Sequence, residues 1–479
     1  MTRTVSFSLS LGCLLALSGC FAKIHQLPAH TDQHQPVFAP LPDRDTLVGL
    51  AVSGGGSRAA TFAAGTLEAL ANVRFMEDGQ ERSVLEAVTH ISSVSGGSLA
   101  TAYYAVKKPA KHEPVFAGQQ LSPAYRQFFA RFKDDMQKNF QIRALGRQVL
   151  NFRVANPTKF AHSFADVWDA NFFDEITFAG LYERTRRGDA PQIMLNGTMY
   201  NSGRRLVLTT LAPADFAYDF TSELRANLVA KGQHFTPEGK ASFDRSVERA
   251  KNQFLPLTME ELGSDHRTLP VSLAVATSAS FPPVVGPVTY QTAGSSSYTH
   301  VGDGGLFDNL GTESLTTLFL NKLNPAHPKA KRGLVIVIDA SYPFDEGAAD
   351  LGESEKGFEV FTEDPARIVG IMEERANAYQ AMLWHSLRTE GVLLPDYDHL
   401  KLIILRHTDA EWTEDDPIPA GCPSGLTPVD VKRILRQIPT LFKIDEDCHA
   451  PLLIAAAKKV VDKQQDRIVK FLAPSATIQ

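Results

Sequence analysis

The chain has 479 residues, of which 43% are hydrophobic and 21% charged, and its formal net charge is -6. Such a composition can bury a large core and excludes a mainly disordered protein. The negative charge, without a basic stripe interleaved with aromatic residues, argues against nucleic acid as a partner.

Residues 1–19 have the pattern of a secretory signal peptide, with Arg3, an apolar run at 5–17 and then small residues. The run is shorter than the roughly 20 apolar residues that span a bilayer, and no later run supplies a span. Its end, Leu-Ser-Gly-Cys at 17–20, resembles the lipobox of bacterial lipoproteins, in which the cysteine is acylated. Acyl chains contribute about 0.8 kcal/mol per buried CH2, so we expect Cys20 to anchor the protein to a membrane. The alternative is a plain signal peptide with an incidental cysteine.

Residues 20–45 are rich in His, Gln, Pro and Asp and lack apolar periodicity, which indicates a tether. Phe21, rather than an aspartate, follows the cysteine, as in lipoproteins that are sorted to the outer membrane. We therefore expect an exported, lipid-anchored protein on the periplasmic side of that membrane.

The folded body is expected to begin at residue 46. An apolar run at 47–52 predicts a buried strand, and apolar spacing at 57–71 predicts a helix. A second strand at 91–94 precedes a helix at 96–106. Alternating strands and helices predict a parallel sheet covered by helices.

Residues 125–178 are crowded with phenylalanine, lysine and arginine. Tyr125, Phe128, Phe129, Phe132 and Met136 have helical spacing, which favours an amphipathic helix packed on the core. The alternative is a lid or a lipid-contacting face.

The rest of the chain continues the pattern of strands and helices. Strands are expected at 192–195 and 206–209, joined through Asn196-Gly197 and Ser202-Gly203, and at 334–338 and 402–405, with an exposed loop at 345–357. Helices are expected at 366–387, 429–437 and 452–471. These elements predict one large domain at 46–345 and a helical region at 346–479 packed on it.

Two of the four cysteines, Cys422 and Cys448, lie beyond the predicted signal and its lipobox cysteine. In an oxidising compartment they could form a disulfide. Metal binding is the weaker interpretation because no CxxC or HExxH spacing occurs, so no metal is predicted.

The sequence Ser-Val-Ser-Gly-Gly at 93–97 joins the strand at 91–94 to the next helix. A serine there, Ser95, can lie on a sharp turn with its hydroxyl exposed and the helix dipole directed at it. Gly97 supplies the small residue that a closely packed helix needs, whereas Ser93 stands where a glycine is more usual. Alone, the motif fits an ordinary glycine-serine loop equally well.

Three consecutive glycines, Gly54, Gly55 and Gly56, precede Ser57 and Arg58 between the first strand and the first helix. Their N–H groups can point into a concavity and stabilise an anion, which in acyl transfer is the tetrahedral oxyanion. A nucleotide loop is disfavoured because the Lys-Ser/Thr ending is missing and the spacing is not GxGxxG. No cofactor is predicted.

Asp303 lies in the glycine turn Gly302-Asp303-Gly304-Gly305, before a helix. An Asp-Gly pair is common in turns, so this motif alone indicates only a loop.

Together, and in this order, the three motifs resemble those of patatin-like phospholipases. The glycine loop is even more similar to that of the related cytosolic calcium-dependent phospholipases. Two further stretches, at 195–205 and 276–283, also resemble patatin, so the resemblance extends from about residue 47 to residue 341.

The resemblance implies an α/β fold, with three α/β/α layers around a mostly parallel central sheet and a helical C-terminal region. It also implies a hydrolase of phospholipid or other acyl esters, in which Ser95 is the nucleophile and Asp303 its base, without a histidine. The remaining site residues implied are the elbow glycine Gly97 and an oxyanion hole of Gly54, Gly55, Gly56 and Arg58. In it the N–H groups of Gly55 and Gly56 would hold the oxyanion, and Arg58 would support the loop or the phosphate.

Two alternatives remain open at this stage. An α/β-hydrolase would use a Ser-Asp-His triad, and His407, just after the strand at 402–405, would be its histidine. A catalytically silent lipoprotein would use the fold only to bind lipid, but it would lack the nucleophile or the acid, and both are present.

Overall fold

The computed structural model describes residues 22–30, 45–151, 159–218, 236–282, 285–323, 328–342, 378, 399–444 and 448–473. The signal peptide at 1–19, Cys20, the loop at 345–357 and, apart from Ala378, the helix at 366–387 lie outside the described residues and stay predictions. Within the described ranges, no helix combines the length and the apolar character needed to cross a membrane.

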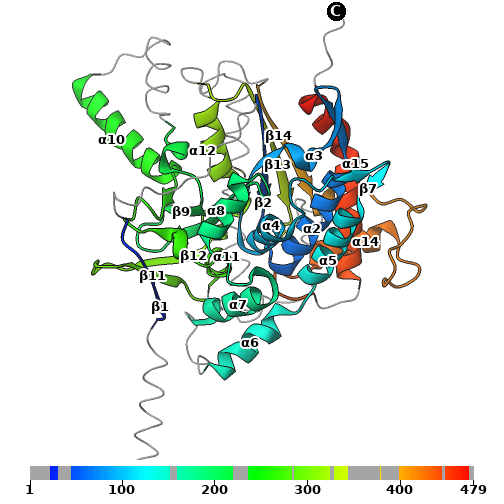
Figure 1. Ribbon diagram of the computed structural model, residues 1–479, viewed down its shortest axis with the longest axis horizontal. Coiled ribbons are helices and arrows are strands. Elements are labelled where there is room, and N and C mark those ends of the chain that lie inside the picture. Colours follow the sequence, from blue (N-terminus) through cyan, green and yellow to red (C-terminus); the bar gives the residue numbers. More distant parts are fainter. Residues whose placement is uncertain are drawn as a thin grey trace, which may run out of the picture.

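A ten-stranded mixed sheet forms the centre of the molecule (Figure 1). Its main order is β1-β11-β12-β8-β5-β2-β13-β14, and β9 and β10 extend from β8. The strands are β1 Ile24–Leu27, β2 Thr46–Val52, β5 Val88–Ser93, β8 Gln192–Met199, β9 Arg205–Thr209, β10 Leu257–Thr258, β11 Val288–Thr292, β12 Thr299–Asp303, β13 Arg332–Asp339 and β14 Leu400–Arg406. Strands β8, β5, β2, β13 and β14 run parallel, whereas β12 is antiparallel to β8 and β11.

Helices surround the sheet, and two small hairpins lie outside it. The helices are α2 Gly56–Asn72, α3 Val84–Ala87, α4 Ser95–Lys107, α5 Pro123–Met136, α6 Phe140–Leu150, α7 Phe160–Trp168, α8 Phe178–Arg186, α10 Pro237–Phe254, α11 Val271–Ser278, α12 Thr312–Lys322, α14 Pro428–Gln437 and α15 His449–Leu472. The hairpins pair β3 Arg74–Glu77 with β4 Gln80–Ser83, and β6 Phe116–Ala117 with β7 Gln120–Leu121.

Alternating side chains of the buried strands face two separate cores. Val48 and Leu50 of β2 belong to the core beneath α2, α4 and α15, whereas Leu47 and Ala51 face α12. Figure 1 shows α2 beside α15 on one side of β2 and β13, with α12 on the other. Gly49 admits α12, because a Cβ there would lie 2.7 Å from the Leu315 side chain. The predicted fold class, α/β with three layers and a mostly parallel sheet, is confirmed.

The phenylalanine-rich segment folds into α5, α6, α7 and α8. Eight of its nine described phenylalanines, at 128, 129, 132, 140, 164, 172, 173 and 178, are buried, and Phe160 is half-buried. They stack on one another and on Tyr103, for example Tyr103 on Phe132 with ring centroids 4.6 Å apart. The interpretation of α5 as a helix packed on the core is therefore confirmed.

The predicted tether at 20–45 is wrong for Ile24–Leu27, which forms β1 and pairs in parallel with β11. An edge strand offers unpaired N–H and C=O groups, and backbone pairing with it requires no apolar periodicity. The predicted break at Asn196-Gly197 is also wrong, since β8 continues to Met199. Gly197 lies inside the sheet, where the Val301 side chain occupies the space that a Cβ would need.

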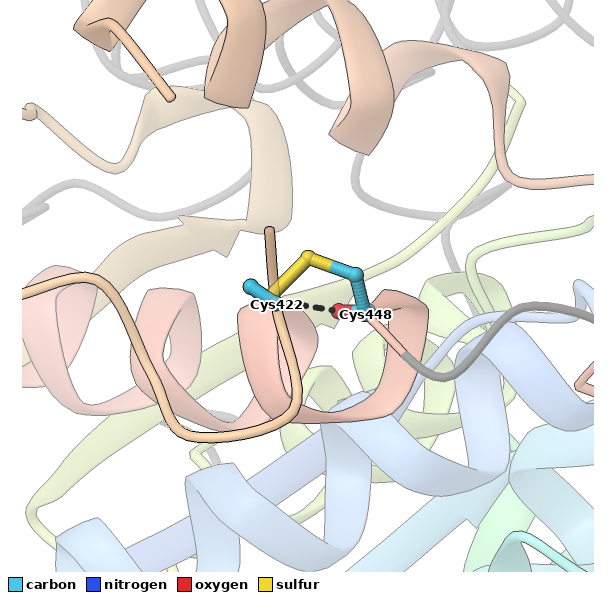
Figure 2. Close-up of a disulfide and its surroundings, with 2 residues drawn as sticks. All are labelled: Cys422 and Cys448. Carbon is cyan, nitrogen blue, oxygen red and sulfur yellow. Dashed lines mark hydrogen bonds between the residues drawn. A yellow bond between two sulfur atoms is a disulfide. The ribbon is translucent and has the colours of Figure 1, made fainter. Parts of the chain in front are cut away.

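The C-terminal region packs on the same domain and also extends its sheet. Strand β14 contains the strand predicted at 402–405 and pairs with β13, so the helical region also adds a strand to the sheet. Helix α15 lies against α2 at Gly65, where an added Cβ would meet that of Ala457 at 3.0 Å. The predicted disulfide between Cys422 and Cys448 is present and ties the segment before α14 to the start of α15 (Figure 2).

Candidate active site

Ser95 lies at the junction of β5 and α4 in a strained backbone conformation. Its φ is 52°, in the left-handed region that residues other than glycine rarely adopt. Its N–H donates to Ser278 Oγ at 3.1 Å, which holds this conformation. A Cβ at Gly96 would collide with the carbonyl of Gly56, and one at Gly97 would lie 2.5 Å from the carbonyl of Ser53. Both glycines are therefore required for the turn to pack against the glycine loop.

The glycine loop between β2 and α2 has two N–H groups that can donate to a ligand. The N–H of Gly54 donates to the carbonyl of Asn309 at 2.9 Å, so its assignment to the oxyanion hole is wrong. Gly55 and Gly56 have φ values of 138° and 58°. Neither of their N–H groups makes a hydrogen bond within the described part of the chain. The loop therefore has two adjacent N–H groups with which to bind an anion.

Arg58 is buried at the base of the glycine loop. Its guanidinium donates to the carbonyls of Ala340 at 2.8 Å and Ile438 at 2.5 Å, and to Thr440 Oγ1 at 2.9 Å. Each nitrogen of the guanidinium thus holds a neighbouring segment. Arg58 therefore supports the glycine loop, which is one of the two roles predicted for it.

The antiparallel direction of β12 carries Asp303 to Ser95. Asp303 is the last residue of β12 and pairs with Gly197 of β8, two residues beyond Leu195, which pairs with Ser93. The carboxyl group therefore lies just past the end of β5, where Ser95 is. Its Oδ1 accepts a hydrogen bond from the N–H of Gly305 at 2.8 Å.

Burial raises the pKa of Asp303 to about 7, although hydrogen bonds from the Gly305 N–H and the Ser95 hydroxyl lower it. The side chain is nearly inaccessible to solvent, so its charged form loses hydration. Among the described residues, Oδ2 has no hydrogen-bond partner of standard geometry. Catalytic hydrogen bonds are often long or poorly aligned before substrate binds. The Ser95 hydroxyl can therefore lower the pKa of Asp303 although its hydrogen bond to the carboxyl group does not have standard geometry.

Ser278 and Asn196 hold the site in position, although no role was predicted for either of them. Ser278 accepts from the Ser95 N–H, and its Oγ donates to the carbonyl of Asn196 at 2.6 Å. The Asn196 side chain donates to Ser92 Oγ and to the carbonyl of Ser93, both at 2.9 Å. Asn196 and Ser278 lie in the two further stretches that resemble patatin, and this resemblance was the sequence signal that could have identified them.

His407 lies away from Ser95. It follows β14, three strands from β5 in the sheet order, which corresponds to about 14 Å at the usual spacing between strands. Its ring is buried against Phe62, and its Nδ1 lies 3.3 Å from the carbonyl of Asp339. Burial lowers the pKa of His407 to about 4. The geometry therefore does not support a triad that includes His407.

In the described ranges, no group of three or more His, Cys, Asp or Glu residues could hold a metal ion. The expectation that no metal or cofactor takes part stays a prediction.

Over residues 50–316, the sequence matches the family model of the patatin-like phospholipases. The chain belongs to this family. The match confirms the predicted family. The matched patatin-like region contains the glycine loop, Ser95 and Asp303. The groups that hold Arg58, at Ala340, Ile438 and Thr440, lie beyond it.

Among solved structures, the patatin-like chain is similar to human GIVD cytosolic phospholipase A2, with a TM-score of 0.44 and 12% identity over 89% of this chain and 60% of that one. It is also similar to the same human enzyme in complex with methyl gamma-linolenyl fluorophosphonate and terbium chloride, with a TM-score of 0.43 and 13% identity over 90% of this chain and 59% of that one. The chain thus spans about three fifths of these structures. No curated protein matches the sequence.

Proposed function

We propose that the protein is a serine acyl-ester hydrolase that cleaves membrane phospholipid through a dyad of Ser95 and Asp303. The observation that carries this proposal is the buried carboxyl group of Asp303, with a pKa of about 7, beside the hydroxyl of a serine held in a left-handed turn. A carboxylate of ordinary pKa is a weak base at neutral pH. Burial makes Asp303 a stronger one without a histidine.

In the first half of the reaction, Ser95 Oγ attacks the ester carbonyl carbon and its proton passes to Asp303. The N–H groups of Gly55 and Gly56 hold the oxyanion that forms. Removal of a single such donor typically slows an enzyme about 100- to 1000-fold. Collapse of the tetrahedral intermediate breaks the ester bond, and the proton on Asp303 goes to the departing alcohol.

In the second half, water attacks the acyl-enzyme and gives its proton to Asp303. The second tetrahedral intermediate is held by the same two N–H groups. Its collapse releases the fatty acid and returns the proton from Asp303 to Ser95 Oγ, which restores the starting state. The reaction is balanced by one water per ester and requires no cofactor.

The proposal includes an acyl anchor at Cys20 and a location on the periplasmic side of the outer membrane. The support is the sequence Leu-Ser-Gly-Cys at 17–20, together with the start of β1 at Ile24, four residues after the cysteine. So short a connection would keep the catalytic domain beside the bilayer. Metabolic labelling with a radioactive fatty acid should mark the wild type and spare Cys20→Ser. Equal labelling of both would rule out this anchor.

The test of activity compares the purified wild type with Ser95→Ala on phospholipid vesicles, with released fatty acid measured by mass spectrometry. We expect release by the wild type and background release by Ser95→Ala. Ser280→Ala, which removes another buried hydroxyl nearby, serves as the matched control and should retain activity. Release that does not depend on Ser95, or no release from any phospholipid or short ester, would reject the proposal.

A further inference from the structure

Helix α6 has apolar side chains on the face that points to solvent. Ile142, Leu145, Val149 and Leu150 are exposed by 69%, 53%, 55% and 72%, and these four residues are called the α6 ridge. The first three recur at helical spacing, so they share one face. A helix that served only the core would be polar there. The α6 ridge therefore requires an apolar partner.

The opposite face of α6 is fixed to the domain. Phe140, Ala144 and Gln148, spaced four residues apart, are buried. Gln148 Oε1 accepts a hydrogen bond from Ser163 Oγ at 2.7 Å, and Asn139 caps the helix by accepting from the Ile142 N–H at 3.1 Å. Because these contacts hold the inner face, the exposure of the α6 ridge follows from the fold.

Two arginines accompany the ridge. Arg143 and Arg147 are one helical turn apart, and both are exposed. The Arg143 guanidinium donates to Asn171 Oδ1 at 3.0 Å, which keeps it at the side of the helix. An apolar face flanked by arginines is typical of helices that lie in the interface of an anionic membrane. The charge thus favours a lipid surface over a second protein with a basic surface.

A short chain of contacts connects α6 with the active site. The N–H groups of Phe140 and Gln141 donate to the carbonyl of Phe442. The preceding carbonyl, of Leu441, accepts a hydrogen bond from the N–H of Ser57, directly after the glycine loop.

In Figure 1, α6 and the amino-terminal end of β1, which begins four residues after Cys20, both lie on the lower side of the view.

We propose that the α6 ridge inserts into a phospholipid bilayer with anionic headgroups and so docks the catalytic domain on its substrate surface. The proposal rests on the proposed function only in that the same membrane supplies the substrate. Ile142, Leu145, Val149 and Leu150 enter the acyl region, and Arg143 and Arg147 meet the phosphates. The acyl anchor holds the chain near the bilayer, whereas α6 orients the domain upon it.

The direct test uses the full mature protein, reconstituted in vesicles of phosphatidylethanolamine and phosphatidylglycerol that contain a lipid with a spin label on its acyl chain. A fluorophore is attached at Gly146→Cys, within the ridge, where an added Cβ meets no atom within 4 Å. The matched control is a fluorophore at Val429→Cys on α14, where the native side chain is 75% exposed. We expect quenching at position 146 and none at 429. The same degree of quenching at both positions, or no quenching at either, would overturn the proposal.

A second measurement links docking with turnover. Leu145→Asp/Val149→Asp should lower the hydrolysis of vesicle phospholipid roughly tenfold or more, since two apolar side chains no longer enter the bilayer. Hydrolysis of a water-soluble short-chain ester should stay within about twofold, because α6 is outside the catalytic machinery. Val429→Asp, the control, should change neither rate. Equal loss on both substrates would contradict membrane docking.

The outcomes separate this inference from the proposed function. A protein that hydrolyses neither substrate but is quenched at position 146 would refute the hydrolase and retain the docking surface. Conversely, hydrolysis without quenching at 146 would refute docking alone. Disulfide crosslinking between two copies of Gly146→Cys, with a dimer mass by light scattering, would identify a second copy of the chain as the occupant and reject the membrane.

Discussion

Replacement of Asp303 by asparagine should stabilise the fold, and the gain should grow with pH. Burial raises the pKa of Asp303 from 3.8 to about 7, so its ionised form is disfavoured in the folded protein. Between these two values the folded state binds more protons than the unfolded state. Stability therefore falls as pH rises through this window. The full cost of ionisation approaches about 4 kcal/mol above pH 7.

The assay measures the free energy of unfolding of the wild type and Asp303→Asn in urea at pH 5 and pH 8. Only the wild type carries this ionisation, so the advantage of Asp303→Asn should increase by roughly 2 to 3 kcal/mol from pH 5 to pH 8. The difference between variants cancels the titration of all other groups. Ser280→Ala, which removes a buried hydroxyl and no titratable group, is the control and should show no such increase. An advantage of Asp303→Asn that stays constant with pH would refute the buried, proton-binding carboxyl.

Three further predictions concern neighbouring residues. Ser278→Ala removes the acceptor of the Ser95 N–H and should lower kcat about tenfold with little change in KM, whereas Ser280→Ala should not; equal effects in a steady-state assay would contradict the positioning role. His407→Ala should retain dyad chemistry, so near-total loss of ester hydrolysis in the folded variant would restore the triad. Removal of the Cys422–Cys448 disulfide, with both residues changed to serine, should cost about 3 kcal/mol in urea unfolding because it closes a loop between residues 26 apart; no change would contradict its contribution.

The strands and helices around the site could be predicted because their signal is local. The apolar run at 47–52 and the helical spacing after Gly56 match β2 and α2 to within a residue. The glycine loop, the elbow and the Asp-Gly turn were likewise recognisable, since each needs small residues at fixed positions for steric reasons. Their order along the chain then indicated the family.

The distribution of hydrogen bonds could not be predicted, because it depends on contacts distant in sequence. Arg58 donates to Ile438, 380 residues away, and Gly54 to Asn309. Ile24–Leu27 looked like a tether because the residues around them are polar, and their partner strand β11 lies about 265 residues away in the sequence. The proximity of Asp303 to Ser95 depends on the antiparallel direction of β12, for which strand periodicity gives no signal.

The most direct test of the dyad is labelling with a fluorophosphonate, followed by peptide mapping. We predict a single adduct on Ser95, none on Ser95→Ala, and much slower labelling of Asp303→Asn. The rate for the wild type should rise with pH with a midpoint of about 7, as Asp303 loses its proton. An adduct on another residue, or labelling of Ser95→Ala at the rate of the wild type, would contradict the account.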